Sequence, residues 1–346
     1  MKIILIQRRD EKSLGWRRAM PPELGTELRP VAGSPFKLPW AMLKVCIAER
    51  TRPRAVVFRY LNDYPNIFKT VARFGSELVV LMIAHLIRAR VGWICHNVDK
   101  ESLEYFPRLT RLRRRCIQRA AHEIYVTDDL LVPVAAEALG VENGQIKVAA
   151  FGSFTKTQRK DEFDSLPAEA RSWLERHKAA GCVVGLWIGS KSEKSRSGLV
   201  SLLKTVKDTD RVAAVIIGVP PQWAKVGPTS ALNALFLPPQ PLHHTEWGQF
   251  DFIWKPCDDV STTVTSIIAA ETGVPLVVHR NSHLHTFVEH YGCGVAIDPE
   301  FTSPDELRTL LNARASQAAR SNVRFSWGRG AEALAALVSD EQEKVH

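Results

Sequence analysis

Short apolar segments with the length of buried β-strands alternate with segments of helical periodicity, and this alternation restricts the fold more than any other feature. In the first half, strands are predicted at residues 2–7, 54–60, 91–95, 123–127 and 146–150. Helices are predicted at residues 39–50, 66–90, 103–121 and 130–139, and loop at the Pro- and Gly-rich residues 20–39. Because strand–helix–strand units build parallel sheets covered on both faces, an α/β protein is predicted.

The same alternation restarts after a polar segment, residues 153–167, which is the best candidate for a linker. Strands are then predicted at residues 182–188, 212–218, 250–254 and 276–278, and helices at residues 168–180, 198–207 and 263–272. A length of 346 residues also suits two domains. The prediction is therefore a domain over residues 1–160, a second over residues 161–325, and a C-terminal helical segment, 326–346, that packs back on the first.

Cysteine usage and hydropathy disfavour several other classes of protein. The six cysteines are scattered without a Cys-x-x-Cys pair, which argues against a disulfide framework or a zinc ribbon and favours a reducing cytoplasm. The longest mostly apolar run, residues 78–87, is too short to span a bilayer. No secretory signal is expected, because only four apolar residues, 3–6, precede Gln7.

Positive charge is concentrated in the first half of the chain. Of the 46 Lys and Arg and 37 Asp and Glu, residues 1–160 hold 28 and 15, a net +13, which leaves 18 and 22, a net −4, for the remainder. The densest cluster consists of Arg108, Arg111, Arg113, Arg114, Arg115 and Arg119. A solvated helix face and a nucleic-acid surface are alternatives, but no nucleic-acid-binding motif accompanies the cluster. Contact with anionic headgroups or a phosphate-bearing acceptor is preferred, at about 1 kcal/mol per basic residue.

Small and charged residues follow most of the predicted strands. In open parallel sheets, ligands bind at the carboxyl ends of the strands. Those ends carry His96-Asn97, Thr127-Asp128-Asp129, Gly152-Ser153, Gly189-Ser190-Lys191, Gly218, Lys255-Pro256 and His279-Arg280. Residues 189–198 join a strand to a helix and could bind phosphate, but they match neither the Walker A pattern nor the dinucleotide G-x-G-x-x-G fingerprint.

A histidine cluster, residues 279–290, allows three interpretations. It could bind a metal, contact phosphate or sugar through His283 or His285, or form an exposed loop. The spacing of these histidines does not match a known zinc site. The sequence also has no nucleophile elbow and no Ser-His-Asp order that would indicate a hydrolase. No metal and no cofactor are therefore expected.

Several of these segments together resemble GT-B glycosyltransferases. Residues 124–127, with a helix ending at Gly140 and residues 145–153, resemble the segment that leads into the second domain of that family. Residues 93–97 are similar to the strand ending in His-Asn in the acceptor domain of bacterial exopolysaccharide glycosyltransferases. Residues 251–278 are similar to the donor site of these enzymes, which include glycosyltransferase family 4-like and xanthan- or gellan-assembly enzymes.

The resemblance implies two Rossmann-like domains that face each other across a cleft. The activity it implies is hexosyl transfer from a nucleoside diphosphate sugar, with a UDP-sugar favoured and UDP-glucuronate open, to a polyprenyl-diphosphate-linked saccharide in exopolysaccharide synthesis. Retaining members carry a Glu-x7-Glu pair where this chain has Val260 and Ile268, so an inverting enzyme is favoured.

Site residues follow from the resemblance in three groups. Catalytic candidates are Asp99, Glu101, Asp128 and His96, although helix capping is an equal alternative for Asp128. Donor and phosphate candidates are Gly189, Ser190, Lys191, Lys194, Arg196, Ser261, Thr262, Thr263 and Glu271. Acceptor and membrane candidates are Arg111, Arg113, Arg114 and Arg115.

The expected partners are the nucleotide sugar, the lipid-linked acceptor and anionic lipids, without nucleic acid. The expected location is the cytoplasm, with peripheral attachment to the inner face of the cytoplasmic membrane by the basic first half and the amphipathic residues 68–90. A core helix is an equal alternative for residues 68–90. A sugar-nucleotide epimerase of the same two-sheet architecture is the alternative function, and a non-catalytic binding module is the third.

Overall fold

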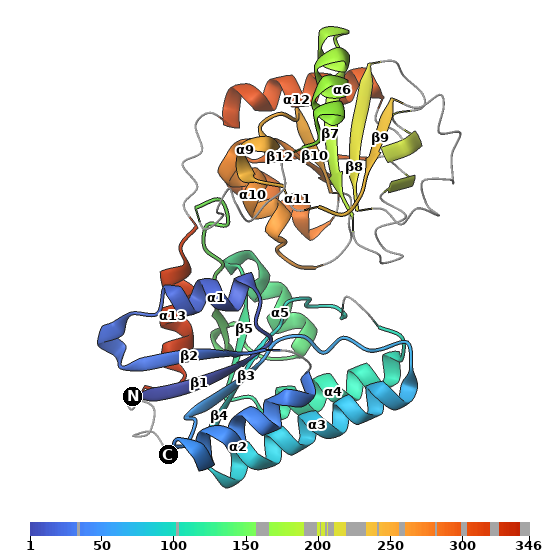
Figure 1. Cartoon of the computed structure of the whole chain (residues 1–346). Coiled ribbons are helices and arrows are strands. Elements are labelled where there is room, and N and C mark those ends of the chain that lie inside the picture. The colour runs from blue at the N-terminus through green and yellow to red at the C-terminus, as the bar shows by residue number, and fades with distance from the viewer. Residues whose placement is uncertain are drawn as a thin grey trace. The chain divides into compact units, whose positions relative to one another are not determined.

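The computed structural model divides into two α/β units (Figure 1). Unit 1 comprises Met1–Gly152 and Phe325–His346, and unit 2 comprises Ser153–Arg324. The residues that the structure describes are 1–32, 35–101, 104–156, 166–189, 199–200, 202–204, 206, 211–218, 233–240, 242–255, 260–280, 282–298, 303–318 and 325–339.

Unit 1 is built on a six-stranded sheet in which every neighbouring pair is parallel. In the sheet order β2-β1-β3-β4-β5-β6, the strands are Thr26–Val31, Lys2–Gln7, Ala55–Phe58, Arg90–Ile94, Glu123–Val126 and Ile146–Val148. All four residues of β3 are buried, as expected for a central strand with helices on both faces. In the edge strand β2, Leu28 alone is buried.

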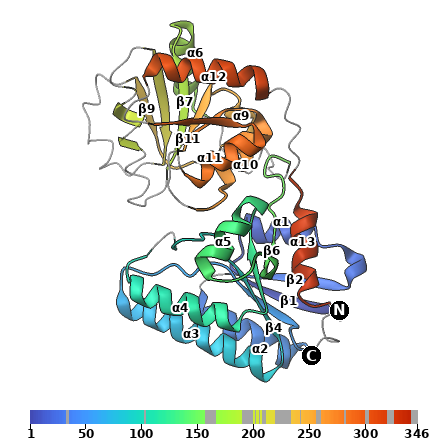
Figure 2. The ribbon, with the colours of Figure 1, turned by 180° about the vertical axis from the view of Figure 1, so that it is seen from behind.

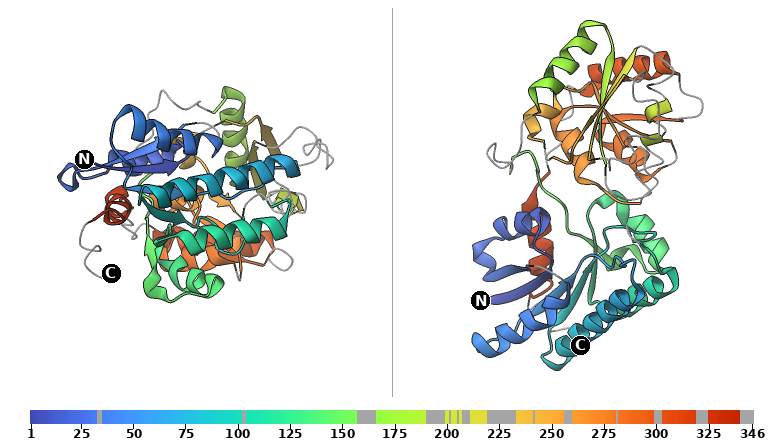
Figure 3. Two further views of the ribbon diagram at one scale, coloured as in Figure 1. Left: turned by 90° about the horizontal axis from the view of Figure 1, so that it is seen from below. Right: turned by 45° about the vertical axis from the view of Figure 1, so that its right-hand side comes forward.

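Three helices cover one face of this sheet. They are α2 (Leu38–Ala48), α3 (Ile67–Leu86) and α4 (Pro107–Ala120), which lie side by side in Figures 1 and 3. The other elements of unit 1 between its strands are α1 (Glu11–Arg18), α5 (Val132–Leu139), and the 3-10 turns η1 (Pro22–Leu24), η2 (Pro35–Lys37), η3 (Asp129–Leu131) and η4 (Asn143–Gln145). Gly140 ends α5 with φ 65°, a left-handed conformation that glycine adopts without strain.

The helix α13 (Trp327–Ala336) belongs to unit 1 although it follows all of unit 2 in the sequence. It contacts α1 and β6. The ring of Trp327 meets the ring of Trp16 edge-on, with 6.0 Å between centroids. A Cβ atom at Gly152 would collide with the backbone of Trp327, and one at Gly330 would collide with the backbone that follows β6. Two glycines therefore allow α13 to approach this closely.

Unit 2 contains a second six-stranded sheet, again parallel at every pair. In the sheet order β12-β11-β10-β7-β8-β9, the strands are Gly294–Ile297, Leu276–His279, Phe252–Trp254, Val183–Ile188, Val212–Ile217 and Ala234–Leu237. Every residue of β8 is buried. The hydrophobic core of unit 2 includes Trp187, Leu202, Ile216, Phe252 and Leu307.

The helices of unit 2 whose two ends the structure describes are α6 (Ala168–Ala179), α9 (His244–Trp247), α10 (Val264–Thr272), α11 (His283–Tyr291) and α12 (Pro304–Ala318). α10 follows β10 and α11 follows β11, and the two helices lie close together in Figures 1 and 2. α10 begins at a capping box between Thr263 and Ser266 and ends at Gly273, whose φ is 72°. Local sequence signals therefore define both ends of this helix.

The predicted α/β fold with two Rossmann-like sheets is confirmed. The prediction of loop for residues 20–39 is wrong, because β2 lies there. Half of the residues of this strand are polar, and it contains Pro30, which is tolerated because β2 is an edge strand. The helix predicted at residues 198–207 falls partly outside the described residues. Within the described parts of the chain, no helix is long and apolar enough to cross a membrane.

Candidate active site

Arg59 organises the carboxyl edge of the unit 1 sheet. It follows β3 and is 1% exposed. Its Nη1 pairs with Asp10 Oδ1 at 2.7 Å, its Nε donates to His96 Nε2 at 3.1 Å, and its Nη2 donates to the Tyr60 hydroxyl at 3.1 Å. The three partners follow β1, β4 and β3, which are adjacent strands. The buried Arg59 therefore fixes the positions of the His96 imidazole and the Tyr60 hydroxyl at this edge.

Aromatic rings line the same edge. The Tyr60 and His96 rings stack with 4.4 Å between centroids and 12° between planes. The Phe151 ring stacks on the other side of His96, with centroids 5.9 Å apart. Lys12 Nζ lies 4.7 Å from the Phe151 centroid and donates to the Tyr60 hydroxyl at 3.3 Å. The Arg8 guanidinium lies 5.2 Å from the Tyr60 centroid. The rings hold these cations by cation–π attraction.

Around His96, the edge carries more positive than negative charge. Burial, together with Lys12, Arg59 and Arg8, lowers the pKa of His96 well below its usual value. The imidazole is therefore neutral at pH 7, and since its Nε2 accepts a hydrogen bond its proton lies on Nδ1. Burial alone would raise the pKa of Asp10, but Arg59 lowers it below its usual value. These three cations and the one carboxylate of Asp10 make the part of the edge around His96 suitable for an anion.

Sequence analysis singles out His96 at this edge but misses its neighbours. Arg8 follows the strand predicted at residues 2–7, so the rule that selected His96 would also have selected Arg8. Arg59 lies inside the strand predicted at residues 54–60 and follows only the shorter observed strand β3. Lys12 and Phe151 carry no such signal, because their position depends on how α1 and the segment after β6 pack.

The predicted catalytic carboxylates differ in their surroundings. Glu101 is 3% exposed, pairs with Arg114 at 3.0 Å, and accepts a hydrogen bond from the Leu61 amide. Burial raises the pKa of Glu101 more than Arg114 lowers it. Asp128 accepts a hydrogen bond from the Leu130 amide at 2.9 Å, which confirms the capping alternative. Asp99 is exposed and lies 3.9 Å from Lys100 Nζ.

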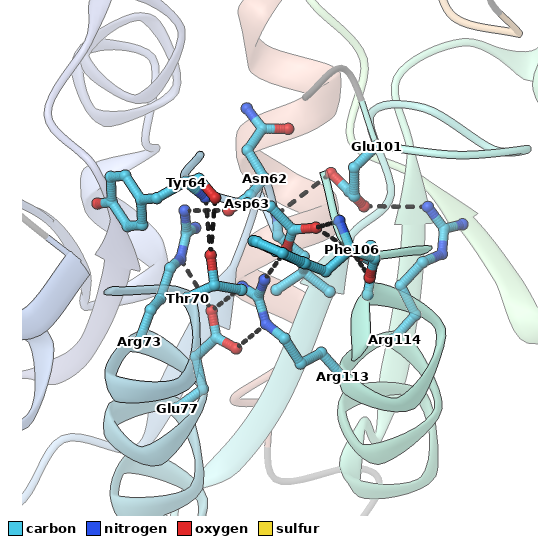
Figure 4. Close-up of polar contacts among 12 residues, drawn as sticks. Asn62, Asp63, Tyr64, Thr70, Arg73, Glu77, Glu101, Phe106, Arg113 and Arg114 are labelled. Carbon is cyan, nitrogen blue, oxygen red and sulfur yellow. Dashed lines mark hydrogen bonds and ion pairs between the residues drawn. The ribbon is translucent and has the colours of Figure 1, made fainter. Parts of the chain in front are cut away.

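Arg113 and Arg114 are inside unit 1, which corrects the expectation that both face an acceptor or a membrane. Arg113 is fully buried and pairs with Asp63 and Glu77, each at 2.7 Å (Figure 4). Arg114 pairs with Glu101 and donates to backbone carbonyls in the segment after β4. These two side chains join α4 to α3 and to the loops that follow β3 and β4. Arg111 and Arg115, by contrast, are exposed.

At the carboxyl edge of the unit 2 sheet, the predicted hydroxyl residues have different roles. Thr263 caps α10, because its Oγ1 accepts a hydrogen bond from the Ser266 amide at 3.1 Å. Thr262 is 5% exposed, and its Oγ1 is a buried atom with no hydrogen-bond partner among the described residues. Ser261 is also buried. An unsatisfied hydroxyl next to a helix N-terminus is suited to an anionic ligand.

His283 lies at the corresponding position of the neighbouring helix. It is the first residue of α11, which Ser282 caps by accepting a hydrogen bond from the His285 amide. Its Nε2 is a buried atom without a hydrogen-bond partner in the described part of the chain. Burial lowers the pKa of His283. Since β10 and β11 are adjacent, the first turns of α10 and α11 begin from neighbouring strand ends.

The remaining donor-site predictions are only partly described. Glu271 Oε2 accepts hydrogen bonds from the Phe154 and Thr155 amides, each at 3.2 Å, and so holds the segment that opens unit 2. Gly189 follows β7, and a Cβ atom there would collide with the ring of Trp187. The residues Ser190, Lys191, Lys194 and Arg196 lie outside the described residues.

Among the described residues at these edges, we find neither a metal cluster nor a reactive thiol. In the described ranges, no group of three or more His, Cys, Asp or Glu side chains is placed to hold a metal ion. Burial raises the pKa of Cys95, next to His96, to about 12, so its thiol is protonated at pH 7.

No protein-family model and no curated protein matches the chain, whereas solved structures resemble it over nearly its full length. HepE from Anabaena, in complex with UDP and glucose, is 15% identical, with 98% of this chain and 100% of that chain covered and a TM-score of 0.62. A glycosyltransferase from Rickettsia africae is 10% identical, with 100% of both chains covered and a TM-score of 0.58.

A third similar structure is the UDP-GlcNAc 2-epimerase from Neisseria meningitidis bound to UDP-GlcNAc. It is 12% identical, with 98% of this chain and 99% of that chain covered and a TM-score of 0.55. At these identities the likeness shows the fold alone. The chain has the two-sheet architecture of the GT-B fold.

Proposed function

We propose that this protein is a glycosyltransferase that moves a sugar from a UDP-sugar to a saccharide linked to polyprenyl diphosphate, in bacterial exopolysaccharide synthesis. The observation that carries this proposal is the donor-rich edge of the unit 2 sheet. There, the Thr262 hydroxyl and the His283 Nε2 atom are buried without a described hydrogen-bond partner, beside the first turns of two helices. Helix N-termini and hydroxyl groups are the donors that a diphosphate requires.

The nucleotide assignment is supported by the likeness to structures that hold UDP or UDP-GlcNAc. In the proposed complex, Ser261 and Thr262 contact the diphosphate of the donor. Lys191, Lys194 and Arg196, which the sequence places in the loop after β7, neutralise the leaving group without a metal ion. A donor with a uronic acid, such as UDP-glucuronate, is compatible with this basic site.

The acceptor is proposed to bind at the carboxyl edge of the unit 1 sheet. Lys12 and Arg8 face the diphosphate of the acceptor, and the half-buried Tyr60 provides a ring surface on which a sugar can stack. Asp99, which is exposed in the segment after β4, is the proposed general base of an inverting transfer. A lipid-linked acceptor places the enzyme at the inner face of the cytoplasmic membrane.

A two-step experiment tests the function. A thermal-shift panel of UDP, GDP, ADP and dTDP should show stabilisation by UDP above the others, because a ligand that binds only the folded state raises its stability. Labelled UDP-sugars are then mixed with a polyprenyl-diphosphate saccharide in the presence of EDTA. Acceptor-dependent release of UDP with extension of the lipid product supports the proposal, and Asp99→Asn should abolish that extension.

The epimerase is the second candidate, because a UDP-GlcNAc 2-epimerase shares the fold over nearly the whole chain. It predicts a change in the configuration of the sugar without any acceptor. Binding of a nucleotide with neither reaction, together with unchanged cellular function of Asp99→Asn, would instead indicate a non-catalytic binding module.

A further inference from the structure

Two of the three charged residues of α3, Arg73 and Glu77, point into unit 1, whereas Lys69 is exposed. Arg73 and Glu77 are 5% and 3% exposed, and they pair at 3.1 Å. Glu77 also pairs with Arg113 of α4, and Arg73 donates hydrogen bonds to the carbonyl groups of Tyr60 and Asn62 (Figure 4). This buried network fixes the rotation of α3 about its axis. The opposite side of the helix must therefore face outward.

That outward side is apolar. The exposed large side chains of α3, spaced three, four or seven residues apart or adjacent, are Ile67, Phe68, Val71, Leu78, Val79, Met82 and Leu86. Phe68 is 80% exposed and Leu86 is 72% exposed. A surface helix of a soluble protein normally has the reverse arrangement, with its apolar stripe toward the core. A contiguous apolar surface of this kind marks an interaction site.

The two neighbouring helices extend this surface and surround it with positive charge. On α2, Trp40 and Ile47 are 72% and 74% exposed, and Lys44 lies between them. On α4, the exposed basic residues are Arg108, Arg111, Arg115 and Arg119. The three helices contain one acidic residue, Glu77, and it is buried. We call the outer side of α2, α3 and α4 the α2–α4 face; Figures 1 and 3 show these helices side by side.

We propose that the α2–α4 face docks on an anionic lipid bilayer, with α3 parallel to the membrane and its apolar side chains inserted among the acyl chains. Charge selects this partner over a second copy of the chain. A symmetric dimer through this face would bring its arginines against the same arginines of the other copy, which is repulsive. Anionic headgroups attract these arginines, and Trp40 suits the boundary between headgroups and acyl chains.

This inference rests on the proposed function in one respect, because a lipid-linked acceptor requires the enzyme to bind a membrane. It adds which surface of the protein makes that contact. Basic residues alone would give attachment that salt abolishes. An inserted apolar stripe adds a component that salt does not weaken, as in other helices that lie in the bilayer interface. Attachment is therefore expected to fall with salt but to persist in part.

Vesicle flotation of the full chain tests the proposal. The wild-type protein should float with vesicles of phosphatidylglycerol and phosphatidylcholine at low salt, and a measurable fraction should still float at high salt. The triple variant Phe68→Glu, Met82→Glu, Leu86→Glu should bind about 100-fold more weakly or worse, since three apolar side chains can no longer insert. Arg111→Gln with Arg115→Gln should weaken binding at low salt and flatten its salt dependence.

Leu24→Glu is the matched control. Leu24 is 43% exposed in η1, outside the α2–α4 face, and its substitution should leave flotation unchanged. The three substituted residues of α3 are exposed, so thermal unfolding of the triple variant should match that of the wild type. If the triple variant does not fold, the single variant Leu86→Glu should still bind about 10-fold more weakly.

Three outcomes would overturn the proposal. They are absence of wild-type binding at low salt, equal binding by wild type and by a folded α3 variant, and complete loss of wild-type binding at high salt. A fourth contradicting outcome comes from light scattering without lipid, if the wild type is a dimer and the triple variant is a monomer. None of these measurements uses a nucleotide, so the UDP-dependent thermal shift can succeed or fail independently of them.

Discussion

The carboxyl edges of the two sheets are built from different chemical groups. The unit 1 edge contains guanidinium, ammonium and imidazole groups. Arg59 at its centre pairs with Asp10 and donates hydrogen bonds to His96 and Tyr60. The unit 2 edge contains hydroxyl groups and helix first turns, with atoms of Thr262 and His283 left without described partners. At the first edge these groups already have partners within the fold, whereas at the second edge two buried polar atoms have none among the described residues. Substitutions at the two edges should therefore affect different properties.

Arg59→Met should have the largest effect of these substitutions, and the property that it changes is the stability of the fold. It leaves the half-buried Asp10 carboxylate and the buried His96 Nε2 atom without their partner, so the free energy of unfolding should fall by about 3 kcal/mol. Urea unfolding measures this change. Arg9→Met, at an exposed arginine two residues after β1, is the control and should change stability little. A loss below about 1 kcal/mol for Arg59→Met would contradict the organising role given to this residue.

Thr262→Val and Thr263→Val should separate binding from stability at the unit 2 edge. Thr262→Val removes a hydroxyl that makes no described hydrogen bond, so UDP affinity should fall about 10-fold with unfolding unchanged. Thr263→Val removes the cap of α10 and should cost about 1 kcal/mol of stability. Calorimetry with UDP and thermal unfolding provide the two readouts. The distinction fails if Thr262→Val is the less stable variant.

Stability should fall as the pH falls, and more through His96 than through His283. Burial lowers the pKa of both imidazoles in the folded state, so the unfolded chain binds protons first. Their contribution is complete above the unfolded pKa of about 6.5 and is lost as the pH falls below it, by up to about 1.4 kcal/mol per pH unit for each proton. His96→Gln should flatten unfolding free energy between about pH 6.5 and 5 more than His283→Gln does. Equal slopes would refute this ranking.

Lys12→Met should give the smallest effect, confined to the unit 1 edge. It removes one half-exposed cation held over Phe151, so affinity for a short-chain polyprenyl diphosphate should fall about 2- to 5-fold. The ammonium group also lowers the pKa of His96, which should therefore rise in the variant. NMR titration of the imidazole measures that shift. UDP affinity is the control and should not change.

The sequence predicts the fold better than the site, for identifiable physical reasons. Buried parallel strands such as β3 and β8 are continuous apolar runs, so their pattern is visible. Half of the residues of the edge strand β2 are polar, and it contains Pro30, so its pairing with β1 leaves no such pattern. β9 and β12 are four residues long and were not predicted either.

Site prediction from sequence fails where partners are distant in the chain. The arginines of α4 look alike in sequence, yet Arg113 faces inward because Asp63 and Glu77, 50 and 36 residues earlier, are placed to receive it. Asp128 behaved as its local context indicated, since an N-cap depends on residues two or three positions away. Local chemistry could therefore be anticipated, whereas assignment of buried ion pairs required the tertiary structure.

The place of α13 has a consequence for the order in which the protein is made. Unit 1 is discontinuous, because its sheet is complete by β6 but α13 emerges from the ribosome only after all of unit 2. Until then, the surface of α1 and β6 that receives Trp327 is uncovered. A nascent chain therefore carries an incomplete first unit throughout synthesis of the second, and α13 completes that unit only after unit 2 has been translated.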